Sequence, residues 1–442
     1  MEMRQASRAS APAGAATGRN GAGAAPGAPA EQPPSVASRL RGRRLEIALF
    51  AGSFLVLALF SGGRLFRQSH APHFIYQADA WLHGQLHLRI PPPDLNDWAR
   101  VGGRWYVSFP PGPALLMLPG VALFGFQFAD VPFTVFFAAI NVVLLFLVLE
   151  RLRRAGDSRR SRGEDAALAL LFAFGTVAFS CSIRGEVWFT AEVLGVTATC
   201  LYLLAAHRAA HPLAAGVAWS FAAITRTPLV FTVVFFVAEL LAGGGSAGES
   251  ARDRATWRDP DRWRKLASFV AAAAPLLAFA AWANWVRFGS PADFGHAHFW
   301  NNRVNADIQR YGLFSFHYLE KQLHAAFTRL PHLEHGRLAY DPDGMSLLVT
   351  TPILALLLWP RARPRLHRTL WATVAVTALP GFLYQNTGYV QFGYRFSLDY
   401  TPYLFLLLAI GARPMTRWFW LLAAAGVAVN TWGALAFAGG AG

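Results

Sequence analysis

Apolar runs recur along the whole chain, and each approaches the length of a membrane-crossing helix. One runs over 45–63 and another over 266–286. A helix needs roughly 20 apolar residues to cross the hydrocarbon core of a bilayer. Hydrophobic residues make up 54% of the 442 residues and charged residues only 15%, against roughly 25% charged residues in a soluble domain. The sequence therefore predicts an all-α polytopic membrane protein with about eleven transmembrane helices.

Arg-rich segments between the apolar runs indicate the orientation. Arg clusters over 39–44 and again over 151–162, and cytoplasmic loops carry an excess of such residues. We therefore expect a multi-pass protein of the bacterial cytoplasmic (inner) membrane, with a cytoplasmic N-terminus and the C-terminus outside. The same bias accounts for the net charge of +15. No recognisable nucleic-acid module accompanies it, so we expect membrane lipids and no nucleic acid among the partners.

The chain divides into a tail and one membrane domain. Residues 1–38 are rich in Ala, Gly, Pro and Ser, a composition that cannot bury a core, so we expect a disordered cytoplasmic tail. Residues 39–442 form the predicted transmembrane domain. Its two long outer loops are expected over 64–132 and 287–343.

One apolar run in the first outer loop is unsuited to crossing the membrane. The run over 114–128 is short, Pro113 precedes it, and Pro119 and Gly120 interrupt it. If it crossed, the Arg cluster over 151–162 would lie outside, against the orientation rule. We therefore expect it to stay in the outer leaflet, as part of a loop that carries interfacial helices.

Ionisable residues gather at the predicted outer ends of the spans, where they are costly and usually functional. Arg can hold a phosphate through its fork of donors, and a carboxylate can accept a proton from a sugar hydroxyl. Four aromatic residues are candidates for stacking on sugar rings, namely Trp98, Trp105, Tyr106 and Trp188. The candidate site residues are His70, Asp79, Asp97, Arg104, Arg184, Glu186, Arg226, Arg395 and Asp399.

Several of these residues also have a purely structural interpretation. Asp79 suits the polar face of a surface helix, and Asp97 precedes a turn that it could cap. Arg104 could anchor the chain at the membrane interface.

In two pairs of candidate residues, the two members could simply form an ion pair with each other. Arg184 and Glu186 could pair across a tight turn. Arg395 and Asp399 are four residues apart, so a helix would place them on one face as an ion pair.

A metal centre is not predicted by spacing. His296, His298 and His317 lie in the second outer loop, but they lack metal-ligand spacing on a known element. We assign no metal ligands, and the sequence leaves open whether the protein uses a divalent metal.

The chain resembles the C-type (GT-C) membrane glycosyltransferases, which include the protein O-mannosyltransferases and the aminoarabinose transferase of lipid A. ADAWLHGQL is similar to the family's first interfacial helix, and VSFPPGPALLMLPGVALFG to its outer-loop Pro-Pro segment. Further similar elements are SIRGEVWF, ITRTPLVF, ANWVRFGSP and YRFSLDYTP. The resemblance covers residues from about 45 to 436.

This resemblance implies transfer of a sugar from a polyprenyl-phosphate donor to a glycan, lipid or protein acceptor at the outer face. The implied reaction is an inverting displacement, in which a carboxylate deprotonates the acceptor and Arg residues stabilise the leaving phosphate. The family usually carries an acidic pair after the first span, where this chain has His70 and Ala71. We therefore expect Asp97 or Asp79 to act as the base.

Two other functions stay open at this point. A lipid or polysaccharide flippase or transporter would suit a polytopic chain, although we find no internal repeat. The missing acidic pair also leaves open a non-catalytic member of the same fold.

Overall fold

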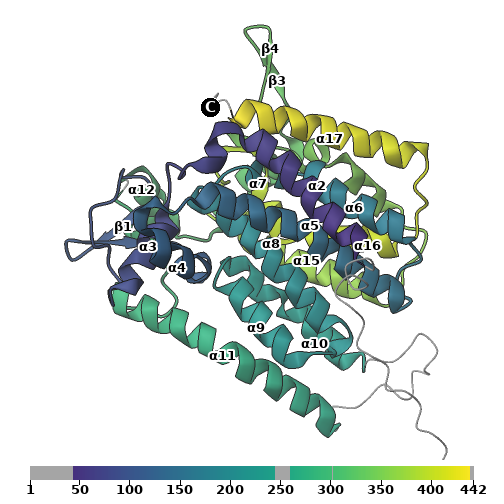
Figure 1. Ribbon diagram of the computed structural model, residues 1–442, viewed down its shortest axis with the longest axis horizontal. Coiled ribbons are helices and arrows are strands. Elements are labelled where there is room, and N and C mark those ends of the chain that lie inside the picture. The colour runs from purple at the N-terminus through teal and green to yellow at the C-terminus, as the bar shows by residue number, and fades with distance from the viewer. Residues whose placement is uncertain (1–42, 244–258, 301, 439–442) are drawn as a thin grey trace, which may run out of the picture. The chain divides into compact units, whose positions relative to one another are not determined.

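The computed structural model describes residues 43–243, 259–300 and 302–438 (Figure 1). The predicted tail over 1–38 and much of the Arg-rich loop around Arg252, Arg254 and Arg258 lie outside the described residues. The described residues from Leu45 onward form one compact unit, which is mostly helical. Five helices are long and apolar enough to cross a membrane, which agrees with a multi-pass membrane protein: Arg44–Phe66, Asp130–Arg154, Val187–Ala209, Pro260–Phe288 and Arg417–Phe437. The count of eleven spans stays a prediction.

The α-helices in chain order are α2 (Arg44–Ser61), α3 (His73–Leu82), α4 (Gly112–Phe124), α5 (Asp130–Arg154), α6 (Arg162–Phe174), α7 (Ala178–Ser182), α8 (Val187–Ala206), α9 (Pro212–Ala223), α10 (Val233–Leu241), α11 (Pro260–Phe288), α12 (Asn302–Tyr311), α13 (Leu319–Leu323), α14 (Leu347–Thr350), α15 (Leu366–Leu383), α16 (Thr401–Ile410) and α17 (Arg417–Ala438). The 3-10 segments are η1 (Gly62–Phe66), η2 (Gly125–Gln127), η3 (His207–Ala209), η4 (Thr227–Thr232), η5 (His296–His298), η6 (Phe316–Tyr318), η8 (Pro352–Leu358) and η9 (Arg395–Asp399), and η7 (His324–Thr328) is a π-helical turn.

The described part of the chain contains three short two-stranded sheets. β1 (Trp98–Val101) pairs antiparallel with β2 (Arg104–Val107), β3 (His332–Glu334) pairs antiparallel with β4 (Arg337–Ala339), and β5 (Asp343–Met345) pairs parallel with β6 (Gln391–Gly393).

Two helical segments are irregular. The apolar segment over 345–359 is divided into α14 and η8 at Thr351, because Pro352 lacks an amide donor and restricts the residue before it. The segment over 316–328 changes type twice, from η6 through α13 to the π-helical turn η7.

Helix α8 is the centre of the described bundle, and α2 and α11 lie at its edge. Helix α8 is almost wholly buried, packed against α5 and α9, and α9 also packs on α11. Most of the apolar surface of α2 and α11 stays exposed in the isolated chain, including Leu59 and Trp285. Such faces are suited to lipid contact.

The first outer loop is folded onto the start of α8. Phe74 and Ile75 of α3 form one buried cluster with Met117 of α4 and Val187 of α8. The β1–β2 hairpin turns at Gly102 and Gly103, both with positive φ (57° and 78°), as a two-residue type I′ turn requires. This packing places the residues just before β1 beside the first turn of α8.

The two ends of this loop meet. The amide and hydroxyl of Ser69 donate to the two carboxylate oxygens of Asp130, each at 2.7 Å, and Gln68 donates to the carbonyl of Phe128 at 3.1 Å. The loop over 64–132 therefore begins and ends on the same face of the bundle. Helix α4 lies between these ends and has 13 residues, fewer than a single crossing requires.

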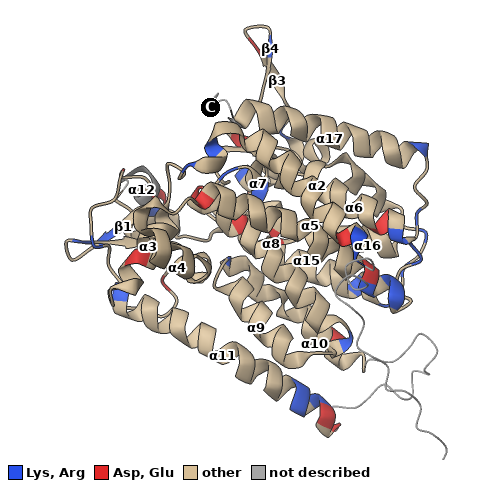
Figure 2. Cartoon of the chain, in the orientation of Figure 1, with Lys and Arg blue, Asp and Glu red and all other residues tan. Residues whose placement is uncertain are grey.

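Several long-range polar contacts each join two segments that are predicted to lie on the same side of the membrane, and charged residues lie mainly at helix ends and in loops (Figure 2). Contacts among predicted cytoplasmic segments are Arg162–Glu46 at 2.9 Å, Arg153–Asp165 at 2.9 Å and Arg365–Glu239 at 2.6 Å. Contacts among predicted outer segments are Ser69–Asp130 at 2.7 Å, His70–Glu186 at 3.2 Å and Arg184 to the Phe437 carbonyl at 2.8 Å.

Candidate active site

The tight turn before α8 holds a carboxylate between two basic side chains. Arg184 donates to both oxygens of Glu186, from Nη2 at 2.7 Å and from Nε at 3.1 Å. His70 reaches the same carboxylate, with Nδ1 3.2 Å from Oε1 of Glu186. The predicted pairing of Arg184 with Glu186 is therefore present, and His70 joins it from the end of the first span.

The pKa values of Glu186 and His70 are shifted by their contacts with each other and with Arg184. Burial alone would raise the pKa of Glu186, but hydrogen bonds from His70 and Arg184 outweigh it and lower the pKa to about 2. The same hydrogen bond with Glu186 raises the pKa of His70, against the effect of burial. Glu186 is thus ionised at neutral pH, and the imidazolium form of His70 is favoured.

Asp97 points from the first outer loop to α8. Its backbone is left-handed, with φ of 59°, and its carbonyl accepts from the hydroxyl of Ser108 at 2.9 Å. The indole N–H of Trp188 donates to its carboxylate at 2.9 Å. Burial raises the pKa of Asp97, although Trp188 and the charge of Arg395 act in the opposite direction. Asp97 therefore lies within electrostatic range of Arg395.

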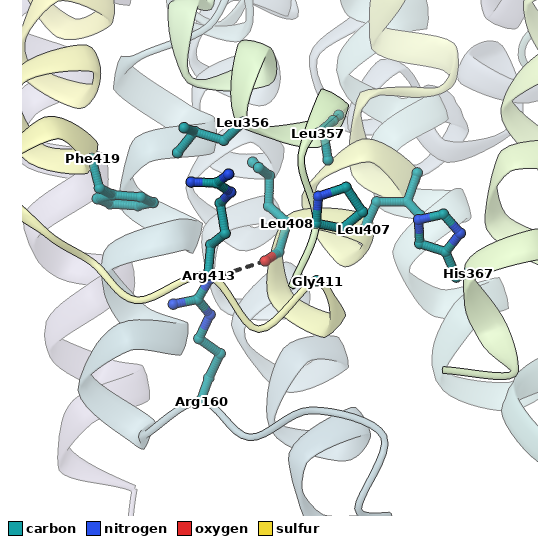
Figure 3. A pocket seen from close by; sticks show the side chains of 10 residues that line it. Arg160, Leu356, Leu357, His367, Leu407, Leu408, Gly411, Arg413 and Phe419 are labelled. Carbon is teal, nitrogen blue, oxygen red and sulfur yellow. Dashed lines mark hydrogen bonds between the residues drawn. The ribbon is translucent and has the colours of Figure 1, made fainter. Parts of the chain in front are cut away.

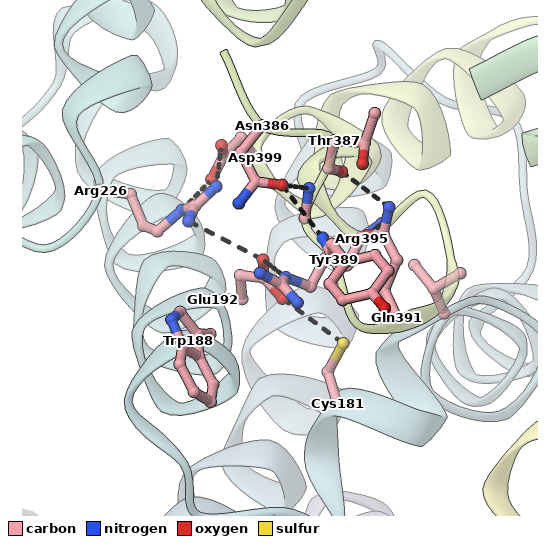
Figure 4. A network of polar contacts seen from close by, with 12 residues as sticks. Cys181, Trp188, Glu192, Arg226, Asn386, Thr387, Tyr389, Gln391, Arg395 and Asp399 are labelled. Carbon is pink, nitrogen blue, oxygen red and sulfur yellow. Dashed lines mark hydrogen bonds and ion pairs between the residues drawn. The ribbon is translucent and has the colours of Figure 1, made fainter. Parts of the chain in front are cut away.

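Deeper in the bundle, two arginines and two acids form an inner network (Figure 4). Arg226 binds Asp399 in a bidentate manner, at 2.9 and 2.7 Å, and Arg395 binds Glu192 at 3.0 Å. A longer contact of 3.8 Å joins Arg226 to Glu192. Each guanidinium in the inner network is thus matched by a carboxylate.

The predicted ion pair between Arg395 and Asp399 is not formed. These residues bound the 3-10 segment η9, in which three residues complete a turn, so positions four apart do not share a face. Their side chains instead bind Glu192 and Arg226.

Two predicted site residues lie apart from these groups. Asp79 is buried in α3, where Nε of Arg89 binds it at 2.9 Å and Nδ1 of His83 lies 3.7 Å away. This arrangement fits its structural interpretation better than a role as base. Arg104 is exposed at the tip of the β1–β2 hairpin.

The four candidate aromatic residues have different surroundings. Trp98 is fully buried and stacks on His73 at 3.7 Å, and Tyr106 is also buried. Trp105 faces the Arg100 guanidinium. Trp188 binds Asp97, a candidate site residue, and the two buried rings are not free to stack on a sugar.

The three candidate His residues of the second outer loop do not form a group with one another. Burial lowers the pKa of His296 to about 4, His298 binds Asp293 at 3.0 Å, and His317 stacks on Tyr311. Within the described ranges, no three His, Cys, Asp or Glu side chains are grouped so that they could hold a metal ion.

A small pocket on the predicted cytoplasmic side is separate from this site (Figure 3). It is lined mainly by Leu and other apolar residues, with Arg160, Arg413 and His367 among them. Arg160 donates to the Leu408 carbonyl at 3.0 Å. No candidate site residue lines this pocket.

Sequence reasoning missed Glu192 and Arg64. Glu192 is fully buried in α8 and binds Arg395, and its signal was an acid within an apolar run. Arg64 lies in η1 near both Arg184 and Glu186. Its signal was an Arg at the predicted outer end of the first span, where orientation alone does not explain it.

No family model and no curated protein sequence matches this chain. Two solved structures are similar to it. One is ArnT from Cupriavidus metallidurans bound to undecaprenyl phosphate, with 15% identity, a TM-score of 0.43, and coverage of 87% of this chain and 63% of that chain. The other is the oligosaccharyltransferase of Archaeoglobus fulgidus in the apo form, with 15% identity, a TM-score of 0.41, and coverage of 89% and 55%. The chain thus spans less than two thirds of either matched structure. Both are C-type glycosyltransferases, the class that the sequence resembles.

Proposed function

We propose that this protein transfers a sugar from a polyprenyl-phosphate donor to a glycan, lipid or protein acceptor at the outer face of the bacterial cytoplasmic membrane. The proposal rests on this chain's own residues. The observation that carries it is the position of Asp97, a carboxylate held by Trp188 at the first turn of α8. The charge of Arg395 acts on Asp97, and Arg184 lies in the turn just before α8.

Asp97 is the proposed general base. Its carboxylate takes the proton of the acceptor hydroxyl while that oxygen attacks the anomeric carbon of the donor. The bond between this carbon and the phosphate oxygen breaks, and polyprenyl phosphate leaves with the electron pair. A raised pKa makes Asp97 a stronger base than an exposed Asp. The anionic leaving group is stabilised by nearby cations.

Replacing Asp97 by Asn tests this role. Asn keeps the side-chain size, can accept from Trp188, and tolerates the left-handed backbone, so the variant is expected to fold. We expect Asp97→Asn to lower transfer by about 10²- to 10⁴-fold, the usual contribution of a general base. The measurement is sugar transfer in proteoliposomes supplied with labelled polyprenyl-phosphate sugars.

A matched control is Asp261→Asn, which changes an exposed acid in the first turn of α11 and should leave transfer unchanged. Transfer by Asp97→Asn at the rate of the unaltered protein would refute the assignment of the base. Movement of the lipid-linked sugar across the bilayer without a new linkage would instead indicate a flippase, and donor binding without transfer a non-catalytic member of the fold.

A further inference from the structure

We infer that the phosphate of the donor binds at Arg64, His70 and Arg184, at the outer end of the first span, and not at Arg226 and Arg395. This inference deepens the proposed function by locating the phosphate of its substrate. We call the three basic residues, together with Glu186, the outer cluster.

Both guanidinium groups of the inner network are already paired with carboxylates. Its two guanidinium groups face two carboxylates, and the short contacts of 2.7 to 3.0 Å leave both acids bound. Arg395 also donates to the carbonyl of Val390 at 3.3 Å. A phosphate here would have to displace Asp399 or Glu192, and a displaced acid would remain buried without a partner, which is costly.

The outer cluster, by contrast, has unused donors. Nη2 of Arg64 is buried and has no hydrogen-bond partner among the described residues. An unpaired buried donor costs free energy that a ligand can recover. His70 uses Nδ1 for Glu186, and 66% of its side chain is exposed, which leaves Nε2 free to bind a ligand.

Three basic side chains of the outer cluster meet one carboxylate of that cluster. Arg184 and His70 bind Glu186, and Arg64 lies near both Arg184 and Glu186. Two other acids lie nearby, and both are already bound. Asp94 accepts the amide of Asn96 and the indole N–H of Trp98. Asp130 lies at the N-terminus of α5 and accepts the amide and hydroxyl of Ser69. The positive end of that helix offsets its charge.

The position of the cluster suits a lipid phosphate. Arg64 lies near the end of the membrane-length helical segment Arg44–Phe66, and Phe66 is 85% exposed. The backbone amide of Val187 donates to the Ala71 carbonyl at 3.1 Å, which fixes the His70 segment to the first turn of α8. Trp188 in that turn binds Asp97. The phosphate site and the proposed base thus flank the same turn.

Direct binding of a polyprenyl monophosphate tests the inference without any transfer step. The protein is placed in phosphatidylcholine nanodiscs, and retention of a radiolabelled polyprenyl monophosphate is measured. Loss of a hydrogen bond to a charged group predicts that Arg64→Gln weakens binding by about ten- to a hundredfold. The matched control is Arg67→Gln, three residues away and exposed, which should change binding less than about twofold.

A conservative variant and two competitors make the binding test specific. Arg64→Lys keeps the charge and should retain part of the binding, which separates loss of the ligand contact from loss of folding. Inorganic phosphate and phosphatidylglycerol are added as competitors. If either displaces the polyprenyl phosphate at equal concentration, the site binds phosphate in general and its assignment to the donor is wrong.

The pH dependence of binding reports His70. The groups that face it are Glu186, Arg184, Asp94 and His73. Because Glu186 raises its pKa, His70 stays charged at low pH and loses its proton as the pH rises through that raised value. Binding should therefore weaken as the pH rises, and Glu186→Gln should move the midpoint of this change to lower pH.

The polyprenyl monophosphate also titrates, but it does so equally with the unaltered protein and with Glu186→Gln. The measured quantity is therefore the difference between the midpoints of these two proteins. His70→Gln should remove this pH-dependent step, and an unchanged midpoint in both variants would contradict the inference.

The two proposals can fail separately. If no sugar is transferred but binding depends on Arg64 and His70, the phosphate site stands and the proposed reaction does not. If Asp97→Asn abolishes transfer while Arg64→Gln and His70→Gln bind the lipid normally, the reaction stands and this site is wrong.

Discussion

Glu192 is the residue on which the pairing of the inner arginines depends. It is fully buried, accepts from Arg395 at 3.0 Å, and is also reached by Cys181, whose thiol donates at 3.4 Å. Two charges held in a low-dielectric bundle are tolerable only while they stay paired. The inner network is therefore interpreted as structural, with the deeper arginines kept in place by their acids.

Neutralising Glu192 should destabilise the protein. Glu192→Gln leaves Arg395 buried without a carboxylate, and removal of one partner of a buried pair costs about 3–5 kcal/mol. We expect a clear fall in the midpoint of thermal unfolding, followed by intrinsic Trp fluorescence in detergent. Glu334→Gln, on the exposed hairpin β3–β4, serves as the control. Equal midpoints for the two variants would show that the inner network does not stabilise the bundle.

At the scale of elements, the contact that matters most is between α4 and the turn that carries Arg226. The amide of Gly112, the first residue of α4, donates to the Ile224 carbonyl at 2.7 Å. A Cβ at Gly112 would lie 2.2 Å from Oγ1 of Thr225 and 3.0 Å from the carbonyl of Ile224. The first outer loop can therefore approach the bundle this closely only through a glycine.

Gly112→Ala should separate these elements. The backbone must shift because Thr225 and Ile224 cannot both move away, and overpacking of this kind costs about 1–3 kcal/mol. We expect lower transfer and a lower unfolding midpoint. Gly163→Ala, in α6, meets open space and should leave both unchanged. Normal transfer by Gly112→Ala would mean that the site tolerates movement of α4.

For the whole molecule, the segregation of contacts onto two sides is the main observation. Arg162 binds Glu46 at the start of α2, whereas Asp130 at the start of α5 binds Ser69 just after α2 ends. Helices α2 and α5 therefore run in opposite directions between the same two sides. If α4 crossed the membrane, the side on which α5 starts would be reversed relative to the end of α2.

Labelling of single cysteines tests this topology. Both native cysteines are buried, so they should react slowly. In a background that retains them, Arg104→Cys and Arg154→Cys should react with a membrane-impermeant maleimide from opposite sides of oriented vesicles, because both parent residues are exposed. Reaction of both from one side would mean that α4 crosses the membrane.

The sequence by itself determined the features that depend on neighbours along the chain. Apolar runs and Arg clusters predicted a polytopic membrane protein, and Gly102-Gly103 lies at the turn of the β1–β2 hairpin. The pairing of Arg184 with Glu186 was also open to prediction, since only Gly185 separates them. Only the tertiary structure decided which partners the other charges take. Arg226 binds Asp399 across 173 residues and Arg395 binds Glu192 across 203, in place of the local pair that spacing suggested. Spacing fixes which residues share a face of one helix, but contact between helices depends on how the bundle packs, and that packing left Arg64 with an unused donor.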